Sequence, residues 1–136
     1  MTVYLDTSDL VKLYVDEPGA DDVRRLVGEA EVVVTSAVAY AETRATFARR
    51  RRERLMTAAE SKAAIQQFDA DWPRFMVLPV DADLAREAGR LADAHAVRGC
   101  DALHLAAFEF LLGKSEDDVR FSCADARLKD AARALG

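Results

Sequence analysis

The stretch Val3-Tyr4-Leu5-Asp6-Thr7-Ser8 decides how the rest of the chain is interpreted. Three residues that favour a strand are followed at once by an acid and two hydroxyl residues, and either hydroxyl residue can cap a helix. The stretch therefore predicts a brief buried strand that ends at Asp6 and passes directly into a helix.

The same alternation of short strands and longer helices continues to the end of the chain. Further strands are expected at residues 32–35, 75–78 and 119–122, where apolar and β-branched residues cluster. Helices are expected up to a break at residues 16–19, around residues 23–27, at 36–54, at 57–72, from Asp81 or Asp83 to Gly99, at 101–112 and at 126–135. Strands separated by helices pair in parallel, because a parallel neighbour needs a long crossover. The pattern predicts a central, mainly parallel sheet covered by helices on both faces.

The composition limits the class of protein. The 136 residues include 51% hydrophobic and 32% charged side chains, which suits a single domain over residues 1–136. No apolar run approaches the roughly 20 residues of a membrane span, and the first residues lack the pattern of a signal peptide. Two cysteines are too few for a disulfide scaffold, so a cytoplasmic protein with no membrane partner is expected. The net charge of −5 means that binding to nucleic acid needs a local basic patch or bound cations.

Four acidic residues are predicted to lie near one edge of the sheet. Asp6 follows the first strand, Asp125 follows the last, Asp101 opens a helix and Glu42 lies early in the helix after the second strand. Sites in such sheets form outside the carboxyl ends of the strands. Each acid also has a structural explanation, as a turn residue, an exposed helix position or a helix N-cap.

The neighbours of these acids favour a site over the structural explanations. Glu42 lies in an apolar stretch, and Asp101 precedes a nearly all-apolar run that predicts a buried helix. An unpaired buried charge is costly, so converged carboxylates need a partner. Carboxylate oxygens suit a hard divalent cation, and we therefore expect Mg²⁺ or Mn²⁺.

Four segments carry a resemblance to a known family. They are residues 6–14, 36–42, 100–106 and 123–128. In content and order they resemble the signature regions of PIN-domain nucleases, and in particular the VapC toxins of bacterial VapBC pairs. The resemblance covers essentially the whole chain and implies a three-layer α/β/α PIN-like fold. One departure is Cys123, because the family commonly has Thr or Ser two residues before its last Asp, and a thiol is a weaker hydrogen-bonding group.

The resemblance implies an activity and the residues that perform it. It implies a metal-dependent endoribonuclease, the toxin of a type II toxin–antitoxin pair, that cleaves single-stranded or structured RNA. The catalytic and metal-binding residues would be Asp6, Glu42, Asp101 and Asp125, with Ser8 as a supporting hydrogen-bond donor. One or two Mg²⁺ or Mn²⁺ ions would act on the scissile phosphate. A small VapB-like antitoxin and a homodimer are implied as well.

The run Arg49-Arg50-Arg51-Arg52 is the densest basic cluster. One interpretation is contact with RNA phosphates, which an acidic nuclease needs somewhere. The other is a solvated helix end, where cations favour the helix dipole. The sequence leaves both open.

Other functions compete with this interpretation. Cys100, His104, His95 and Cys123 could suggest zinc, but they lack the close paired spacing of structural zinc ligands. A PIN nuclease of housekeeping RNA processing and a non-cleaving PIN-like binding module remain as alternatives. Phosphoaspartyl chemistry is disfavoured, because Ser8 stands where a second Asp would be needed.

Overall fold

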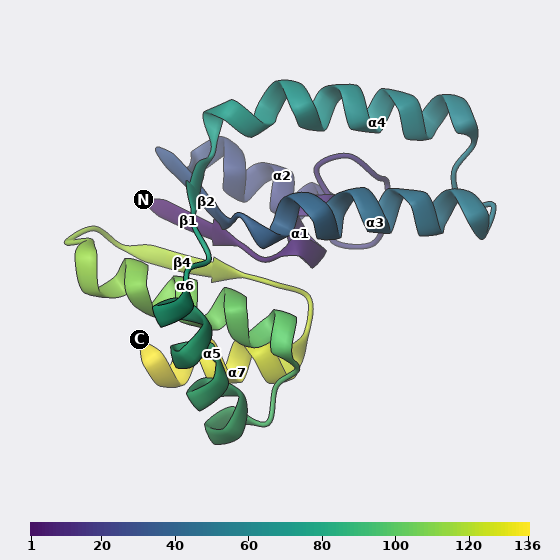
Figure 1. Cartoon of the computed structure of the whole chain (residues 1–136). Helices are drawn as coiled ribbons and strands as arrows, with labels where there is room; N and C mark the ends of the chain where they lie inside the picture. Colours follow the sequence, from purple (N-terminus) through teal and green to yellow (C-terminus); the bar gives the residue numbers. More distant parts are fainter.

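Four parallel strands form the centre of the molecule, as the computed structural model of residues 1–136 shows (Figure 1). They are β1 (Thr2–Leu5), β2 (Val32–Ser36), β3 (Met76–Leu78) and β4 (Val119–Ser122). Their order in the sheet is β3-β2-β1-β4, and all three pairings are parallel. The prediction of a mainly parallel sheet is confirmed. The central strand β1 lies between β2 and β4, so the end of β1 has neighbours on both sides.

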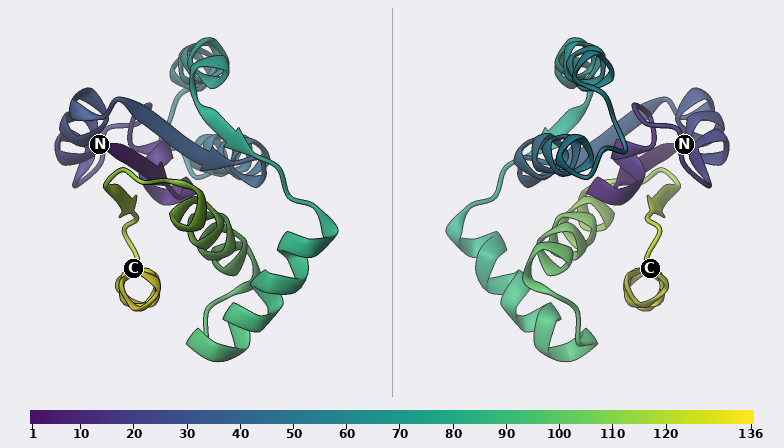
Figure 2. Two further views of the ribbon diagram at one scale, coloured as in Figure 1. Left: turned by 90° about the vertical axis from the view of Figure 1, so that its left-hand side faces the viewer. Right: turned by 90° about the vertical axis from the view of Figure 1, so that its right-hand side faces the viewer.

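Seven α-helices and one short 3₁₀ helix connect and cover the strands. They are α1 (Thr7–Val11), α2 (Ala20–Glu29), α3 (Val38–Arg52), α4 (Ala58–Asp71), η1 (Trp72–Arg74), α5 (Ala82–His95), α6 (Gly99–Lys114) and α7 (Ala126–Leu135). Figure 2 shows α4 on one side of the sheet and α5, α6 and α7 on the other. No helix is both long enough and apolar enough to cross a membrane.

Strand β1 divides the core into two parts. Val3, Tyr4 and Leu5 have no exposed surface, and successive strand residues point to opposite faces of the sheet. Val3 and Leu5 pack in a cluster with residues of α1 to α4, whereas Tyr4 packs in a second cluster with residues of α5, α6 and α7. This arrangement is the predicted three-layer α/β/α fold.

Helix ends follow local capping chemistry. The Thr57 hydroxyl accepts a hydrogen bond from the Glu60 N–H at 3.0 Å, and the Glu60 carboxylate accepts one from the Thr57 N–H at 2.9 Å. These two hydrogen bonds form a capping box at the start of α4, where the sequence predicts a helix from residue 57. The sequence also predicts Ser36 as the cap of the long helix, and its hydroxyl does accept a hydrogen bond from the Val38 N–H at 3.2 Å. However, Ser36 is still the last residue of β2, and α3 begins two residues later.

Two predicted boundaries are wrong. The sequence predicts a first helix that includes Tyr14, but α1 ends at Val11 and the chain continues as a series of turns. The sequence also predicts a helix end at Gly99, but α5 ends at His95, Ala96 adopts a left-handed φ of 53°, and Gly99 is the first residue of α6. Asp101 therefore lies in the first turn of α6 and is not its N-cap.

Candidate functional site

Three of the four predicted acids line one cavity of about 290 Å³. Asp6 follows β1, Glu42 comes from α3 and Asp101 from the first turn of α6. Ser8 lines the same cavity. The fourth acid, Asp125, is not among the lining residues, although its neighbour Ala124 is. The structure thus brings together acids that lie far apart in the sequence and leaves Asp125 outside this cavity.

Asp6 is held at the end of β1 by its own local structure. Its carboxylate accepts a hydrogen bond from the Asp9 N–H at 3.0 Å and caps α1. The Ser8 hydroxyl lies 2.7 Å and 3.0 Å from the two carboxylate oxygens, the contact expected of a supporting donor. Asp6 is only 4% exposed. Burial raises the pKa of Asp6 to about 6, although the hydrogen bonds from Ser8 and Asp9 act in the opposite direction.

Glu42 is held in the carboxylate form by two donors. The Thr7 hydroxyl donates to its Oε1 at 2.6 Å, and the Nε2 of His104 lies 3.0 Å from the same oxygen. Burial raises the pKa of Glu42, but the hydrogen bonds from His104 and Thr7 outweigh burial and hold this pKa below its ordinary value. The pKa values of Glu42 and Asp6 are therefore shifted in opposite directions although the two residues line the same cavity.

A buried histidine connects Glu42 to the centre of the sheet. His104 is 2% exposed, and its Nδ1 lies 2.9 Å from the hydroxyl of Tyr4 in β1. The Glu42 carboxylate can only accept a hydrogen bond, so Nε2 of His104 donates to it. In the tautomer with the proton on Nε2, Nδ1 accepts a hydrogen bond from the Tyr4 hydroxyl. Every polar atom of this chain of contacts has a partner.

Sequence reasoning did not include His104 in the site. The sequence suggests a packed histidine or a zinc ligand, and the structure places His104 in the wall of the acidic cavity. One signal was available, because residues three apart on a helix lie on the same face, and His104 follows Asp101 by three residues. The contact with Glu42 joins residues 62 positions apart and could not be predicted from local pattern.

Asp101 and Asp125 have other contacts. The Asp101 side chain is 23% exposed and lies 3.5 Å from the Nε of Arg98. Asp125 is the N-cap of α7, and its carboxylate accepts a hydrogen bond from the Leu128 N–H at 2.9 Å. The N-cap explanation therefore holds for Asp125 and fails for Asp101. The Cys123 thiol donates at 3.4 Å to the main-chain oxygen of Asp125, so its contact is with the backbone.

The donor set of the cavity suits a hard divalent cation. Its acidic ligands are all carboxylates, and Asp6 is buried without a lysine or arginine bonded to it. As the side chains stand, no three His, Cys, Asp or Glu residues are close enough together to hold one metal ion. Asp6 and Asp101 would hold such a cation, and Arg98 occupies a position 3.5 Å from the Asp101 carboxylate.

Cationic side chains lie beside the acids. Arg49 and Arg50 line the cavity, together with Arg98 and Lys12, whereas Arg51 and Arg52 do not. Consecutive helical residues point in different directions, so only part of the arginine run can face one site. The Nη1 of Arg50 lies 3.4 Å from Glu17, and its Nε is buried without a hydrogen-bond partner.

A buried ion pair lies next to the cavity and was not predicted. The Nζ of Lys12 is 2.8 Å from Asp9, and the two side chains are 11% and 7% exposed. The second oxygen of Asp9 accepts a hydrogen bond from the Ser122 hydroxyl at 2.5 Å. The pair therefore connects α1 to the end of β4.

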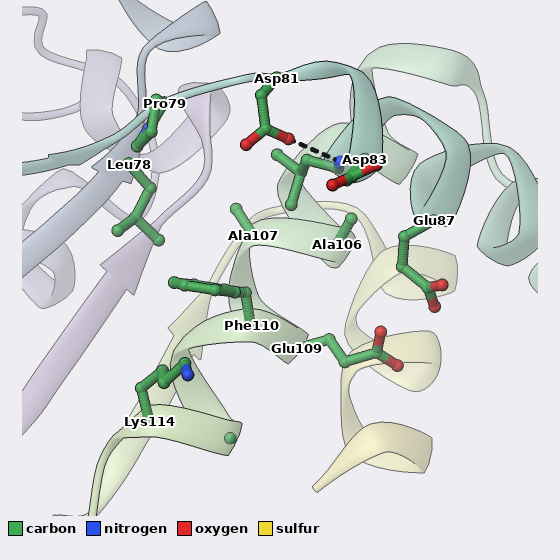
Figure 3. Close-up of a pocket in the computed structure, with 12 residues that line it drawn as sticks. Leu78, Pro79, Asp81, Asp83, Glu87, Ala106, Ala107, Glu109, Phe110 and Lys114 are labelled. Carbon is green, nitrogen blue, oxygen red and sulfur yellow. Dashed lines mark hydrogen bonds between the residues drawn. The ribbon is translucent and has the colours of Figure 1, made fainter.

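Acidic residues also surround a second pocket, of about 560 Å³, between α5 and α6 (Figure 3). Its apolar lining includes Leu78 and Phe110. Asp81 lies there as the N-cap of α5 and accepts a hydrogen bond from the Leu84 N–H at 2.9 Å. Figure 3 shows the carboxylates of Glu87 and Glu109 near each other, and both pair with Arg90. These acids serve helix capping and surface pairing.

Comparison with known proteins identifies the family. The family model described as "PIN domain" matches residues 3–134. Ribonuclease VapC45 of Mycobacterium tuberculosis (strain CDC 1551 / Oshkosh) is 33% identical over 134 residues, which cover 98% of this chain and 91% of the relative. Ribonuclease VapC46 of Mycobacterium tuberculosis (strain ATCC 25618 / H37Rv) is 34% identical over 139 residues, with 98% and 92% covered. The chain therefore belongs to the PIN-domain family, and within it to the VapC-type nucleases.

Solved structures share the fold. FitAcB from Neisseria gonorrhoeae has a TM-score of 0.72 at 19% identity and covers 96% of this chain and 93% of its own. VapC20 of Mycobacterium tuberculosis, a sarcin-ricin loop cleaving toxin, has a TM-score of 0.68 at 20% identity, with 95% and 94% covered. VapBC2 from Rickettsia felis, bound to a DNA fragment from its promoter, has a TM-score of 0.60 at 11% identity, with 92% and 100% covered.

Proposed function

We propose that this chain is a metal-dependent endoribonuclease that acts as the toxin of a type II toxin–antitoxin pair and cleaves single-stranded or structured RNA. The observation that carries the proposal is the convergence of Asp6, Glu42 and Asp101 in one cavity, where Asp6 is buried without a basic partner. The names of the curated relatives support ribonuclease activity, and so does the structural neighbour VapC20, which is a sarcin-ricin loop cleaving toxin.

The residues of the cavity would divide the work. Asp6 and Asp101 would hold Mg²⁺ or Mn²⁺, with Glu42 beside them in the cavity and Asp125, from outside it, completing the acidic set. When bound, the cation polarises the scissile phosphate and lowers the pKa of a bound water. Ser8 and the Asp9 N–H orient the Asp6 carboxylate, as described above. His104 and Thr7 keep Glu42 in its place as an ionised acceptor.

The arginines of the cavity supply the attraction that an acidic protein otherwise lacks. Arg49 and Arg50 line the cavity with the acids, so they would contact an RNA phosphate on one side of the cleaved bond. Arg51 and Arg52 point elsewhere and correspond to the solvated helix end. The two interpretations of the arginine run thus apply to different halves of it.

The partner proposed for the toxin is a small VapB-like antitoxin. Two structural neighbours, VapBC2 and FitAcB, support this partner, because their names are those of two-component pairs. An antitoxin segment that places a cation in the acidic cavity would block the metal site directly. We also propose a homodimer and a cytoplasmic location, as expected from the sequence.

The direct test is cleavage of RNA by the purified chain, freed from antitoxin, with Mn²⁺ and with chelator. We expect cleavage only with metal, and loss of cleavage in Asp6→Asn and Asp101→Asn while both variants stay folded. Asp83→Asn, at an exposed acid of the α5–α6 pocket, is the matched control and should cleave normally. Undiminished cleavage by Asp6→Asn or Asp101→Asn, or equal cleavage in chelator, would refute the assignment. A stable, folded chain that never cleaves would instead be a binding module.

Growth distinguishes a toxin from a nuclease of RNA processing. Expression of the chain should arrest growth, and co-expression of the adjacent small open reading frame should restore it. Arrest that requires Asp6 but is not relieved by any neighbouring gene would contradict the toxin–antitoxin assignment and leave the nuclease assignment intact.

A further inference from the structure

A second polar hollow lies next to the acidic cavity. Its volume is about 410 Å³, and Lys12 and Ala124 line both the hollow and the cavity. The boundary between them is the loop after β4, where the Ala124 N–H donates to the Ser8 hydroxyl at 3.2 Å. The same hydroxyl bonds Asp6, so the hollow begins one side chain away from the proposed metal ligand. We call it the β4 hollow.

The β4 hollow has an excess of cationic side chains. Lys12, Arg120 and Lys129 line it, against the two acids Asp9 and Asp22. Lys12 is already neutralised by Asp9, at 2.8 Å. Arg120 is exposed, and its ion pair with Asp118 has a separation of 3.6 Å with both side chains more than half exposed. Such a pair is weak in water, and Lys129 has no ion pair at all, so both cations are free to bind another anion.

We propose that the β4 hollow binds a phosphate of the RNA chain that flanks the cleaved phosphate. The RNA would pass from Arg49 and Arg50 on one side, across the acidic cavity and over Ala124, to Arg120 and Lys129 on the other. This inference rests on the proposed ribonuclease function. Its physical reason is that a chain of phosphates can cross a cluster of carboxylates only where cations hold it on both sides.

The contacts in the hollow indicate recognition of the backbone rather than of bases. Phe121 is its aromatic lining residue, and this ring is stacked on Tyr4 with 5.4 Å between ring centroids and an interplanar angle of 6°. Its face toward Tyr4 is therefore occupied within the core. The two available cations are the Lys129 ammonium and the Arg120 guanidinium, and both suit phosphate oxygens. The β4 hollow should add affinity without adding sequence preference.

The test measures how RNA binding depends on salt and on RNA length. The full chain carrying Asp6→Asn, which prevents cleavage, is the parent, and the variant adds Arg120→Ser and Lys129→Ser at two exposed positions. Fluorescence anisotropy follows binding of single-stranded RNAs of about 4 and about 20 nucleotides. Loss of one phosphate contact with single-stranded RNA lowers the salt slope by about 0.7, so the slope of the variant should fall by that amount with the longer RNA. Its affinity for that RNA should fall about tenfold, and its affinity for the short RNA much less.

A matched control separates local contact from net charge. The control variant Lys62→Ser with Arg86→Ser also removes one lysine and one arginine, from exposed positions of α4 and α5 that line neither the β4 hollow nor the acidic cavity. It should change neither the salt slope nor the affinity for RNA. An Arg120/Lys129 variant with the parent slope, or one that weakens both RNAs equally, would overturn the β4 hollow as a subsite. If the unmutated chain cleaves RNA with Mn²⁺ in that experiment, the ribonuclease function survives. If the unmutated chain neither binds nor cleaves RNA, both proposals fall.

Discussion

The acidic cavity and the α5–α6 pocket contain the same kind of side chain in opposite situations. In the α5–α6 pocket, Asp81 caps its own helix, and Glu87 shares Arg90 with Glu109 (Figure 3). In the cavity, Asp6 is 4% exposed, has no basic residue bonded to it, and has a pKa raised to about 6. The difference shows that the number of acids does not identify a site. Burial of a charge without a compensating cation does, because that arrangement is costly unless a ligand offsets the cost.

The largest effect is expected at the ion pair beside the cavity. Lys12→Met leaves Asp9 charged, buried and unpaired, and we expect the free energy of unfolding to fall by about 3–5 kcal/mol. Arg90→Met breaks an exposed pair of the α5–α6 pocket and should have little measurable effect. Urea denaturation of both variants makes the comparison. If both variants lose the same free energy of unfolding, burial does not determine how much an ion pair contributes to stability in the two regions.

Asp6→Asn should lower the cleavage activity and raise the stability of the metal-free protein. Loss of a metal ligand is expected to lower cleavage at least about 100-fold. The metal-free variant should nevertheless be more stable than the parent by about 1–3 kcal/mol at neutral pH, because the amide removes a buried charge. Thermal melting in chelator tests the second part. If the metal-free Asp6→Asn protein melts at a lower temperature than the parent, the buried charge of Asp6 does not destabilise the metal-free protein.

Asp6 and Glu42 should change the pH dependence of the free energy of unfolding in opposite directions. The pKa of folded Asp6 is raised to about 6 from an ordinary value near 3.8, so the folded state holds the extra proton between these values. The contribution of Asp6 to stability is fully present below its ordinary pKa. It declines as pH rises through the folded pKa of about 6, by about 2–3 kcal/mol in total. The lowered pKa of Glu42 acts in reverse, stabilising above its ordinary value and losing that effect as pH falls. Denaturation of parent and Asp6→Asn in chelator from pH 4 to 7 isolates the Asp6 part as the difference between the curves, and coincident slopes would contradict it.

The smallest effect is expected at Tyr4. Tyr4→Phe keeps the buried ring but leaves the Nδ1 of His104 without a donor, at a cost of about 1–2 kcal/mol of stability. Because His104 orients Glu42, cleavage should fall about tenfold with metal affinity lowered. Titration calorimetry with Mn²⁺ measures that affinity. Tyr14→Phe, which breaks a bond to Asp71 on the opposite side of the sheet, is the control and should leave metal binding unchanged.

Much of the fold could be predicted from the sequence, because the patterns that mark strands and helix starts involve residues close together in the chain. The run Val3-Tyr4-Leu5 and the β-branched run at residues 32–35 predicted strands that the structure contains. The helix predicted from residue 57 is α4, and Thr57 and Glu60 cap its start. The end of the first helix was not predicted. Helix α1 ends early at Val11, and its Asp9 pairs with Lys12 and accepts a hydrogen bond from Ser122, 113 positions away in the chain.

The sequence by itself determined where strands end and which acids follow them, because periodicity and capping operate over a few residues. Only the tertiary structure decided that Asp6, Glu42 and Asp101 share a cavity while Asp125 stays outside it. It also decided that His104 supports Glu42, and that half of the arginine run faces the acids. Pairing and burial of charge depend on residues more than 100 positions apart, as in the contact of Asp9 with Ser122, 113 positions away. No local pattern encodes that distance, since it is set by how the helices pack on both faces of the sheet.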